Sequence, residues 1–251
     1  MRFNLRVAMV LLASVTLPAL PGPAVAQSFS PDQRHEIEGI VKNYLIAHPE
    51  VMQDILAAVD AHQKLTAAEK TAATIKANNA TLFYSPHEVV LGNPNGKVTA
   101  VEFFDYNCAF CKRALPDMLR LLRSDGNLRF VLKEFPVLGP GSVDAAHVAV
   151  AARMQDPTGV KYIEFHQKLL GGRGEADLAR ALAVAKEVGF DMDRLQRDMK
   201  SPEVKATIDE DMKLADTLGV DGTPTYVIGD QVVVGAVGYD ELDKKITALQ
   251  K

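Results

Sequence analysis

Residues 98–111 read VTAVEFFDYNCAFC and combine two signals in one short stretch. The first seven residues are apolar at almost every position, which is typical of a central strand covered by helices on both faces. Two cysteines, Cys108 and Cys111, follow at C-x-x-C spacing, where a helix is predicted to begin and to run to about Arg123. A thiol pair placed directly after a buried strand and at the start of a helix is typical of a thiol–disulfide active site.

The position of each cysteine suggests its role. At a helix start, unpaired backbone N–H groups and the positive end of the helix dipole favour a thiolate, and they lower a cysteine pKa from about 8.5 into a range of about 3.5–7.5. Cys108 is therefore the predicted nucleophile. Cys111 lies one turn further along on the same helical face, where it is placed to attack a mixed disulfide at Cys108. It is the predicted resolving thiol.

Three other interpretations of the pair remain open. A zinc site needs about four ligands, and the chain offers only these two cysteines, with no two histidines at the spacing of zinc modules. We therefore expect no metal at this pair. A purely structural disulfide is a second alternative, although a loop this short gives little stabilisation. Two buried, inert thiols are the third, but the polar segment 105–107 and the cations Lys112 and Arg113 suggest an exposed site.

Glu102 is the one charged residue within the apolar strand. A buried carboxylate is costly unless it is paired or protonated, and protonation would appear as a raised pKa. One interpretation makes Glu102 a proton acceptor for Cys111. The other, which the sequence favours slightly, is a structural ion pair with Arg129 or Lys133 on the neighbouring strand.

The rest of this region alternates between strand and helix patterns. A second strand is predicted over 128–135, a helical block over about 143–218, short strands over 225–228 and 232–234, and a last helix over about 239–249. The pattern indicates an α/β protein whose strands flank a large helical insertion. Pro224 opens the third strand, and an X-Pro bond is where a cis peptide becomes energetically accessible, although a trans loop proline is the more common outcome.

The segment before the strands is helical in pattern. Ser30, Pro31 and Gln33 form an N-terminal capping signature, and a helical apolar pattern follows until His48-Pro49 interrupts it. A second helix is predicted to resume and to fade near Asn79. The sequence leaves two interpretations open, a helical hairpin folded onto the main domain and a protruding oligomerisation arm, because the width of an apolar stripe does not separate them. Turn residues over 78–79 and 85–96 predict the boundary of the main domain, between a helical region 27–85 and a domain 86–251.

The first 26 residues resemble a secretory signal peptide. Arg2 and Arg6 precede an apolar run that is too short to span a bilayer, and a small-residue pattern ends at Ala26. We expect cleavage after Ala26 and export to an oxidising compartment, the bacterial periplasm. The net charge of −4 over 251 residues gives no general attraction for phosphate backbones, so we expect no nucleic-acid partner.

Together these residues resemble the DsbA-like branch of the thioredoxin-fold proteins. The resemblance rests on Phe103–Lys112, the helical insertion and the segment Gly219–Thr225, and it covers about residues 89–251. The leading helices are similar to the N-terminal region of ScsC (suppressor of copper sensitivity) relatives, on helix content and length alone. The resemblance implies a thioredoxin fold with an inserted helical domain and an N-terminal helical extension.

The resemblance also implies roles for the site residues. It makes Cys108 an exposed nucleophile and Cys111 its buried partner, and it implies a cis Pro224 against the thiol pair. Thr223 would then offer backbone hydrogen bonds to an extended substrate peptide. One departure matters. Ala109-Phe110 replaces the Pro-His dipeptide of the strongly oxidising members, so the redox poise is not carried over, and about 30 mV corresponds to about 1.4 kcal/mol for this couple.

The sequence thus predicts an exported thiol–disulfide oxidoreductase that needs no cofactor beyond its own Cys108–Cys111 disulfide. Its predicted partners are cysteine-containing exported proteins and a membrane redox partner that recycles the thiols. An oligomer built through residues 30–79 would act as an isomerase, whereas a monomer would act as a dithiol oxidase. A copper-binding or chaperone-like thiol protein is the alternative from another class, because two thiolates can hold Cu(I), although the eight methionines are scattered.

Overall fold

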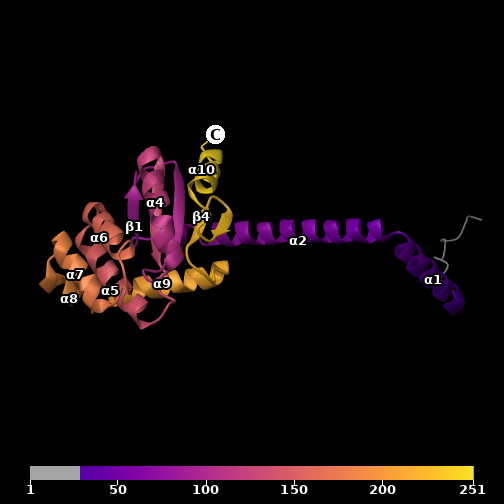
Figure 1. The fold of residues 1–251 in the computed structure, drawn as a ribbon, viewed down its shortest axis with the longest axis horizontal. Helices are drawn as coiled ribbons and strands as arrows, with labels where there is room; N and C mark the ends of the chain where they lie inside the picture. The colour runs from indigo at the N-terminus through magenta and orange to yellow at the C-terminus, as the bar shows by residue number, and fades with distance from the viewer. Residues whose placement is uncertain (1–28, 251) are drawn as a thin grey trace, which may run out of the picture. The chain divides into compact units, whose positions relative to one another are not determined.

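The computed structural model describes residues 29–250, so the predicted leader and its cleavage site lie outside the described residues. The described residues form ten helices and five strands, and Figure 1 shows how they follow one another along the chain. In chain order they are α1 (Pro31–Ala47), α2 (Pro49–Ala77), α3 (Asn79–Tyr84), β1 (Val89–Gly92), β2 (Val98–Phe104), α4 (Ala109–Ser124), β3 (Leu128–Glu134), α5 (Pro140–Gln155), α6 (Val160–Leu170), α7 (Leu178–Val188), α8 (Met192–Asp198), α9 (Pro202–Leu218), β4 (Thr225–Ile228), β5 (Gln231–Val234) and α10 (Tyr239–Ala248).

The chain forms two compact units that divide between Val59 and Asp60, within α2. In the first unit, α1 begins as predicted. The Gln33 amide donates to Ser30 Oγ at 3.2 Å, and the Ser30 amide donates to Gln33 Oε1 at 2.9 Å, which completes a capping box. The helix ends before His48-Pro49, so the predicted break is confirmed. None of the helices in the described residues is long and apolar enough to span a membrane.

The second unit is built around a sheet that has five strands in the described residues, in the order β1-β3-β2-β4-β5. β2 and β3 are parallel, as a strand–helix–strand unit requires, and the other pairs are antiparallel. Side chains alternate between the two faces of a sheet, and nearly all of those in β2 and β3 are buried. Both faces of the sheet are therefore covered. Phe104 of β2 and Leu132 of β3 pack on one face with α4, α10 and the helical insertion, whereas Phe103 and Val131 pack on the other with α3 and α9. The α/β class and the predicted helical insertion are confirmed.

Two elements at the start of this unit were not predicted. Residues 79–84 form α3 and residues 89–92 form β1, although the sequence pattern placed a domain boundary there. Leu82 and Phe83 of α3 are buried in the core of the second unit, together with Ile75 of α2. The division at Val59 therefore lies earlier than the predicted boundary at 85/86.

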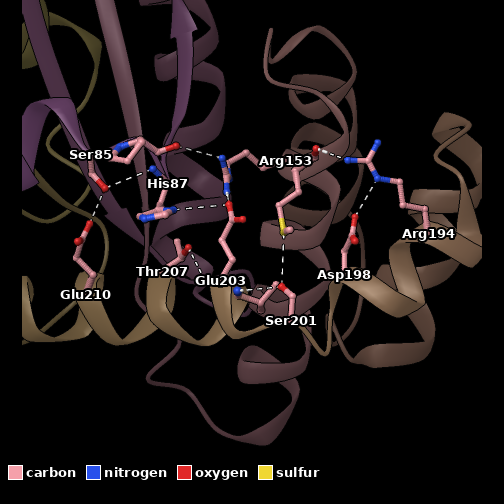
Figure 2. Close-up of polar contacts among 12 residues, drawn as sticks. Ser85, His87, Arg153, Arg194, Asp198, Ser201, Glu203, Thr207 and Glu210 are labelled. Carbon is pink, nitrogen blue, oxygen red and sulfur yellow. Dashed lines mark hydrogen bonds and ion pairs between the residues drawn. The ribbon is translucent and has the colours of Figure 1, made fainter.

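The segment between α3 and β1 is fixed to the helices that follow it (Figure 2). Ser85 Oγ donates to Glu210 Oε1 of α9 at 2.6 Å. The Arg153 guanidinium of α5 donates to the Pro86 carbonyl at 3.3 Å and pairs with Glu203. These contacts hold the segment that was predicted as a domain boundary within the second unit.

Candidate active site: a thiol pair at the start of α4

Cys108 is the N-cap residue of α4. Its backbone is extended, and its Sγ accepts a hydrogen bond from the Cys111 amide at 3.4 Å. Its sulfur thus takes the place that a Ser or Asp oxygen fills at other helix starts, facing the unpaired amides of the first turn. Both cysteines are free thiols in this structure. The predicted helix start is confirmed, and this geometry gives Cys108 its distinct chemistry.

The two thiols differ strongly in acidity. A hydrogen bond from the Cys111 thiol lowers the pKa of Cys108 most, whereas burial opposes this effect. Further hydrogen bonds from Thr223 and from the amides of Cys111 and Phe110 bring the pKa of Cys108 to about 5. The hydrogen bond to Cys108, burial and the charge of Glu102 all raise the pKa of Cys111. At neutral pH the pair therefore carries one thiolate, on Cys108, and one thiol, on Cys111.

Both cysteines are buried, which corrects one expectation. Cys108 is 5% exposed and Cys111 is 0% exposed, so Cys108 is not the exposed nucleophile that the resemblance implied. The Thr223 carbonyl covers it: this oxygen lies 3.1 Å from Cys108 Sγ and accepts a hydrogen bond from the protonated thiol. The exposed residue of the motif is Phe110, at 54%.

Thr223, which precedes Pro224, contacts Cys108 although it lies far along the chain. The Thr223–Pro224 peptide bond is cis. The Gly235 amide donates to the Pro224 carbonyl at 2.8 Å, which holds the segment after β5 against this loop. A groove of about 410 Å³ runs beside the pair, and it is lined by Phe110 and Arg113 of α4, by residues 222–224 and by residues 234–237.

Glu102 lies on the same sheet face as Phe104 and is 3% exposed. It is aligned with Leu132 of β3 and Tyr226 of β4. The Tyr226 hydroxyl donates to Glu102 Oε1 at 3.4 Å. Burial raises the pKa of Glu102 to about 8, against the opposing effect of the Tyr226 hydrogen bond, and the nearby Cys108 adds to the rise.

The predicted ion pair of Glu102 is wrong. Side chains of Arg129 and Lys133 leave β3 on the face opposite to Leu132, with which Glu102 is aligned. Arg129 donates to the Phe83 carbonyl, and Lys133 pairs with Asp211 at 3.0 Å and with Glu88. Sequence reasoning missed Tyr226 as the partner of Glu102, because strand register across the sheet is not written in the local pattern.

Asp105 and Tyr106 before Cys108 are buried and Asn107 is half-buried, which corrects the expectation of an exposed polar approach. The carboxylate of Asp105 accepts hydrogen bonds from the amides of Val137 and Leu138, at 2.9 and 3.0 Å, and from Ser142 Oγ at 2.7 Å. Asn107 pairs with the backbone of Ala176, accepting from its amide at 2.7 Å and donating to its carbonyl at 3.1 Å. These polar residues were visible in the sequence, but their role in joining the turn to the helical insertion was not.

Comparison with known proteins places this geometry in a family. The model of the DSBA-like thioredoxin domain matches residues 99–247, and the model of the copper resistance protein ScsC N-terminal domain matches residues 33–69. The chain is similar to a thioredoxin-like oxidoreductase from Silicibacter pomeroyi, with 46% identity and a TM-score of 0.65, covering 69% of this chain and 98% of that one.

Two further relatives extend the comparison. The thiol–disulfide exchange protein alpha-DsbA2 from Wolbachia pipientis is 32% identical with a TM-score of 0.68, covering 72% of this chain and 97% of that one. A Na⁺/H⁺ antiporter of Salinispora arenicola is 30% identical over 161 residues, covering 63% of this chain. The chain spans only 24% of that antiporter's length. The chain belongs to the DsbA-like family of thiol–disulfide oxidoreductases, with a ScsC N-terminal domain ahead of its DsbA-like thioredoxin domain.

Proposed function

We propose that this chain exchanges disulfides with the cysteines of exported proteins through Cys108 and Cys111. The observation that carries the proposal is the position of Cys108 Sγ, which faces the Cys111 amide at 3.4 Å in the first turn of α4. A pKa of about 5 makes this sulfur a thiolate at neutral pH and also a good leaving group.

In the reducing direction, the Cys108 thiolate attacks one sulfur of a substrate disulfide. A bond forms between that sulfur and Cys108 Sγ, and the second substrate sulfur leaves as a thiolate. Cys111 then passes its proton to the ionised fraction of Glu102 and attacks Cys108 Sγ, which releases the first substrate sulfur as a thiolate. The substrate gains two electrons and the cysteine pair becomes a disulfide. The oxidising direction is the same sequence reversed, and the Thr223–Pro224 loop holds the substrate peptide by strand addition in both directions.

Glu102 is the proposed proton carrier for Cys111. Its pKa of about 8 leaves it mostly protonated at neutral pH, which suits the return of a proton to Cys111 as the disulfide opens. When it is ionised, Glu102 also contributes to the raised pKa of Cys111, which supports a role for this carboxyl beside that thiol. No cofactor enters these steps, because the two cysteines themselves hold the electron pair. A membrane redox partner is needed to restore the working state.

The decisive test is the pH dependence of Cys108 alkylation together with exchange assays. We expect the alkylation rate of the reduced protein to follow a titration with a midpoint near pH 5. Cys108→Ser should abolish insulin reduction and the recovery of scrambled ribonuclease, whereas Cys111→Ser should trap mixed disulfides at Cys108. A midpoint near that of free cysteine, or full activity in Cys108→Ser, would refute the function.

We further propose that the protein assembles through its first unit and works as an isomerase. Support comes from a hollow of about 550 Å³ on this unit, lined by residues that include Ile37, Val41, Leu45 and Met52. Val41 is 51% exposed, and large apolar surfaces left in water mark interaction sites. A second copy of the same helices is the occupant we propose, because the ScsC N-terminal match covers this same surface. Several reduced sites on one oligomer could then act on one scrambled substrate.

Light scattering of full-length variants tests the assembly. Val41→Glu places a charge in the hollow and should dissociate the oligomer, whereas Asn43→Glu adds the same charge at an exposed polar position of α1 and should not. Removal of residues 27–59 keeps Ile75 and α3, which belong to the core of the second unit. This truncation should stay folded, reduce insulin and lose isomerase activity. A truncated monomer that keeps full isomerase activity would support the monomeric oxidase instead.

The proposed location is the bacterial periplasm. Support comes from the leader pattern that ends at Ala26, and from the need of a dithiol–disulfide enzyme for an oxidising compartment. The mass of the exported protein should correspond to a chain that begins at Gln27. A chain that retains Met1 after fractionation would exclude cleavage of this leader.

A further inference from the structure

Arg113 is the one charged side chain among the described residues that line the groove beside the thiol pair. The remaining lining is apolar or glycine apart from the hydroxyl of Thr223. We infer that Arg113 selects substrate polypeptides that carry a carboxylate side chain two or three residues from the reacting cysteine. This inference rests on the proposed function and names the substrate class of the same site.

The guanidinium of Arg113 is held in place and is available. Its Cζ lies 4.8 Å from the centroid of the Phe110 ring, so an exposed aromatic ring supports it. Within residues 29–250 it has no carboxylate partner within 4.0 Å. Lys112, the neighbouring cation, instead donates to the carbonyls of Gly172 and Gly174 in the helical insertion, at 3.5 and 3.0 Å.

The spacing along α4 sets the register of the substrate carboxylate. Arg113 comes five residues after Cys108, which is about 7.5 Å along a helix at about 1.5 Å per residue. An extended peptide advances about 3.3 Å per residue, so its second or third residue from the reacting cysteine reaches this level. The planar fork of an arginine matches a carboxylate, and the Phe110 ring reduces the freedom that such a contact would cost.

The net charge of the whole protein opposes a preference for acidic peptides. A faster reaction with an acidic peptide would therefore point to a local contact. At a net charge of −4, the long-range field favours a basic peptide over an acidic one. A preference for an acidic peptide must therefore come from a local contact. Exposed ion pairs of this type change an affinity by about 1.4- to 5-fold.

Peptide kinetics with the reduced full-length protein test the inference. Each peptide carries one cysteine as a mixed disulfide with a neutral thiol, and the set differs only at the second or third residue on either side, which is Glu, Gln or Lys. Rate constants at low salt are divided by those for dithiothreitol, which removes the intrinsic reactivity of each disulfide. We expect Glu to exceed Lys by about two- to fivefold on one side of the cysteine, and the difference to vanish at high salt.

The variants separate recognition in the groove from an effect on the thiolate. Arg113→Gln should abolish the preference, Arg113→Glu should reverse it, and Arg113→Lys should keep part of it. Arg123→Gln is the matched control, because it removes the same charge from an exposed position in the last turn of α4. Alkylation of Cys108 by neutral iodoacetamide should be the same in the wild-type protein and in Arg113→Gln.

Each outcome bears on the inference directly. Equal rates for the Glu and Lys peptides, or a preference that persists in Arg113→Gln, would overturn it while leaving the proposed function intact. A parallel loss of iodoacetamide reactivity in Arg113→Gln would also overturn it, because Arg113 would then act on the thiolate. Peptides that are all inert towards the wild-type protein would instead refute the proposed function.

Discussion

The two faces of the central sheet bury charged side chains in opposite ways. On the face that carries α4, Glu102 has a neutral partner, the Tyr226 hydroxyl at 3.4 Å. On the other face, Lys133 is fully buried and pairs with Asp211 at 3.0 Å and with Glu88, and it also donates to the Thr81 carbonyl at 2.9 Å. In the described residues, Glu102 thus has no cation as a partner, whereas Glu88 and Asp211 share the cation of Lys133.

The difference separates a group that can change its protonation from a group that fixes the structure. Burial raises the pKa of both Glu102 and Glu88 to about 8. The attraction of Lys133 opposes this rise for Glu88, while Asp211 and Glu88 together hold the pKa of Lys133 above its ordinary value. Lys133 therefore ties together α9, β3 and the segment before β1. Among the described residues Glu102 has no cationic partner, which supports its proposed role as a proton carrier for Cys111.

Removing the positive charge of Lys133 should cause the largest loss of stability. Lys133→Met leaves Glu88 and Asp211 facing each other, and we expect the free energy of unfolding to fall by about 3–5 kcal/mol at neutral pH. The loss should shrink towards pH 5, where both carboxyls bind protons, since the pKa of Asp211 is raised to about 6. Urea unfolding at several pH values measures this effect.

Lys97→Met is the matched control, because Lys97 is exposed. It should change the unfolding free energy by less than about 0.5 kcal/mol. The alkylation rate of Cys108 in folded Lys133→Met should equal that of the wild-type protein, because the two sites lie on different faces. A loss below about 1 kcal/mol in Lys133→Met would show that the buried cluster does not hold the second unit together.

Replacing Glu102 should change how the free energy of unfolding depends on pH. The folded-state pKa of about 8 lies above the ordinary value of 4.5, so the folded protein binds more protons than the unfolded chain between these values. Stability from this group is therefore complete below about pH 4.5 and falls as the pH rises towards about 8, by at most about 1.4 kcal/mol per pH unit. The unfolding free energy of Glu102→Gln minus that of the wild-type protein should therefore increase by roughly 2–3 kcal/mol from pH 5 to pH 7.

The difference between the two proteins at each pH is the quantity to measure, because it cancels the titration of Glu88 and of Cys108. Glu88→Gln serves as the companion variant on the other face. A constant difference between Glu102→Gln and the wild-type protein from pH 5 to pH 8 would contradict the raised pKa of Glu102 and, with it, the proton-carrying role.

Tyr226→Phe should give the smallest effect. The Tyr226 hydrogen bond lowers the pKa of Glu102, so its removal should move the titration of Glu102 to a pH above 8. We expect a stability loss of about 1 kcal/mol at neutral pH. The infrared band of the protonated carboxyl follows this titration. Tyr84→Phe, at an exposed tyrosine, should leave the titration of Glu102 unchanged. A lower pKa of Glu102 in Tyr226→Phe would rule out this hydrogen bond as a stabiliser of the carboxylate.

Much of the second unit was predictable because its signals are local. β2 and β4 have their predicted bounds, and α4 begins one residue after Cys108, because apolar runs, turn residues and a cap are each visible in a short window. α3 and β1 were not predictable in this way. A six-residue helix and a four-residue strand are too short to show a period, and the turn residues beside them suggested a domain boundary.

The site was predictable in its residues but not in its contacts. C-x-x-C spacing at a helix start located Cys108 and Cys111, but the Thr223 carbonyl that covers Cys108 comes from a position 115 residues away. The partner of Glu102 depended on strand register, which aligns Glu102 with Leu132 and turns Lys133 to the opposite face. Such contacts depend on tertiary packing and leave no periodic trace in the sequence.

The paired hydrogen bonds between Asn107 and Ala176 have a consequence for engineering the helical insertion. The Asn107 side chain makes the two hydrogen bonds that a backbone peptide group would make, so the 171–176 connection is joined directly to the residue that precedes Cys108. A graft or deletion in that connection would disturb the thiol chemistry even if every helix of the insertion still folded. We therefore expect the alkylation rate of Cys108 to report how well a transplanted insertion packs against this turn.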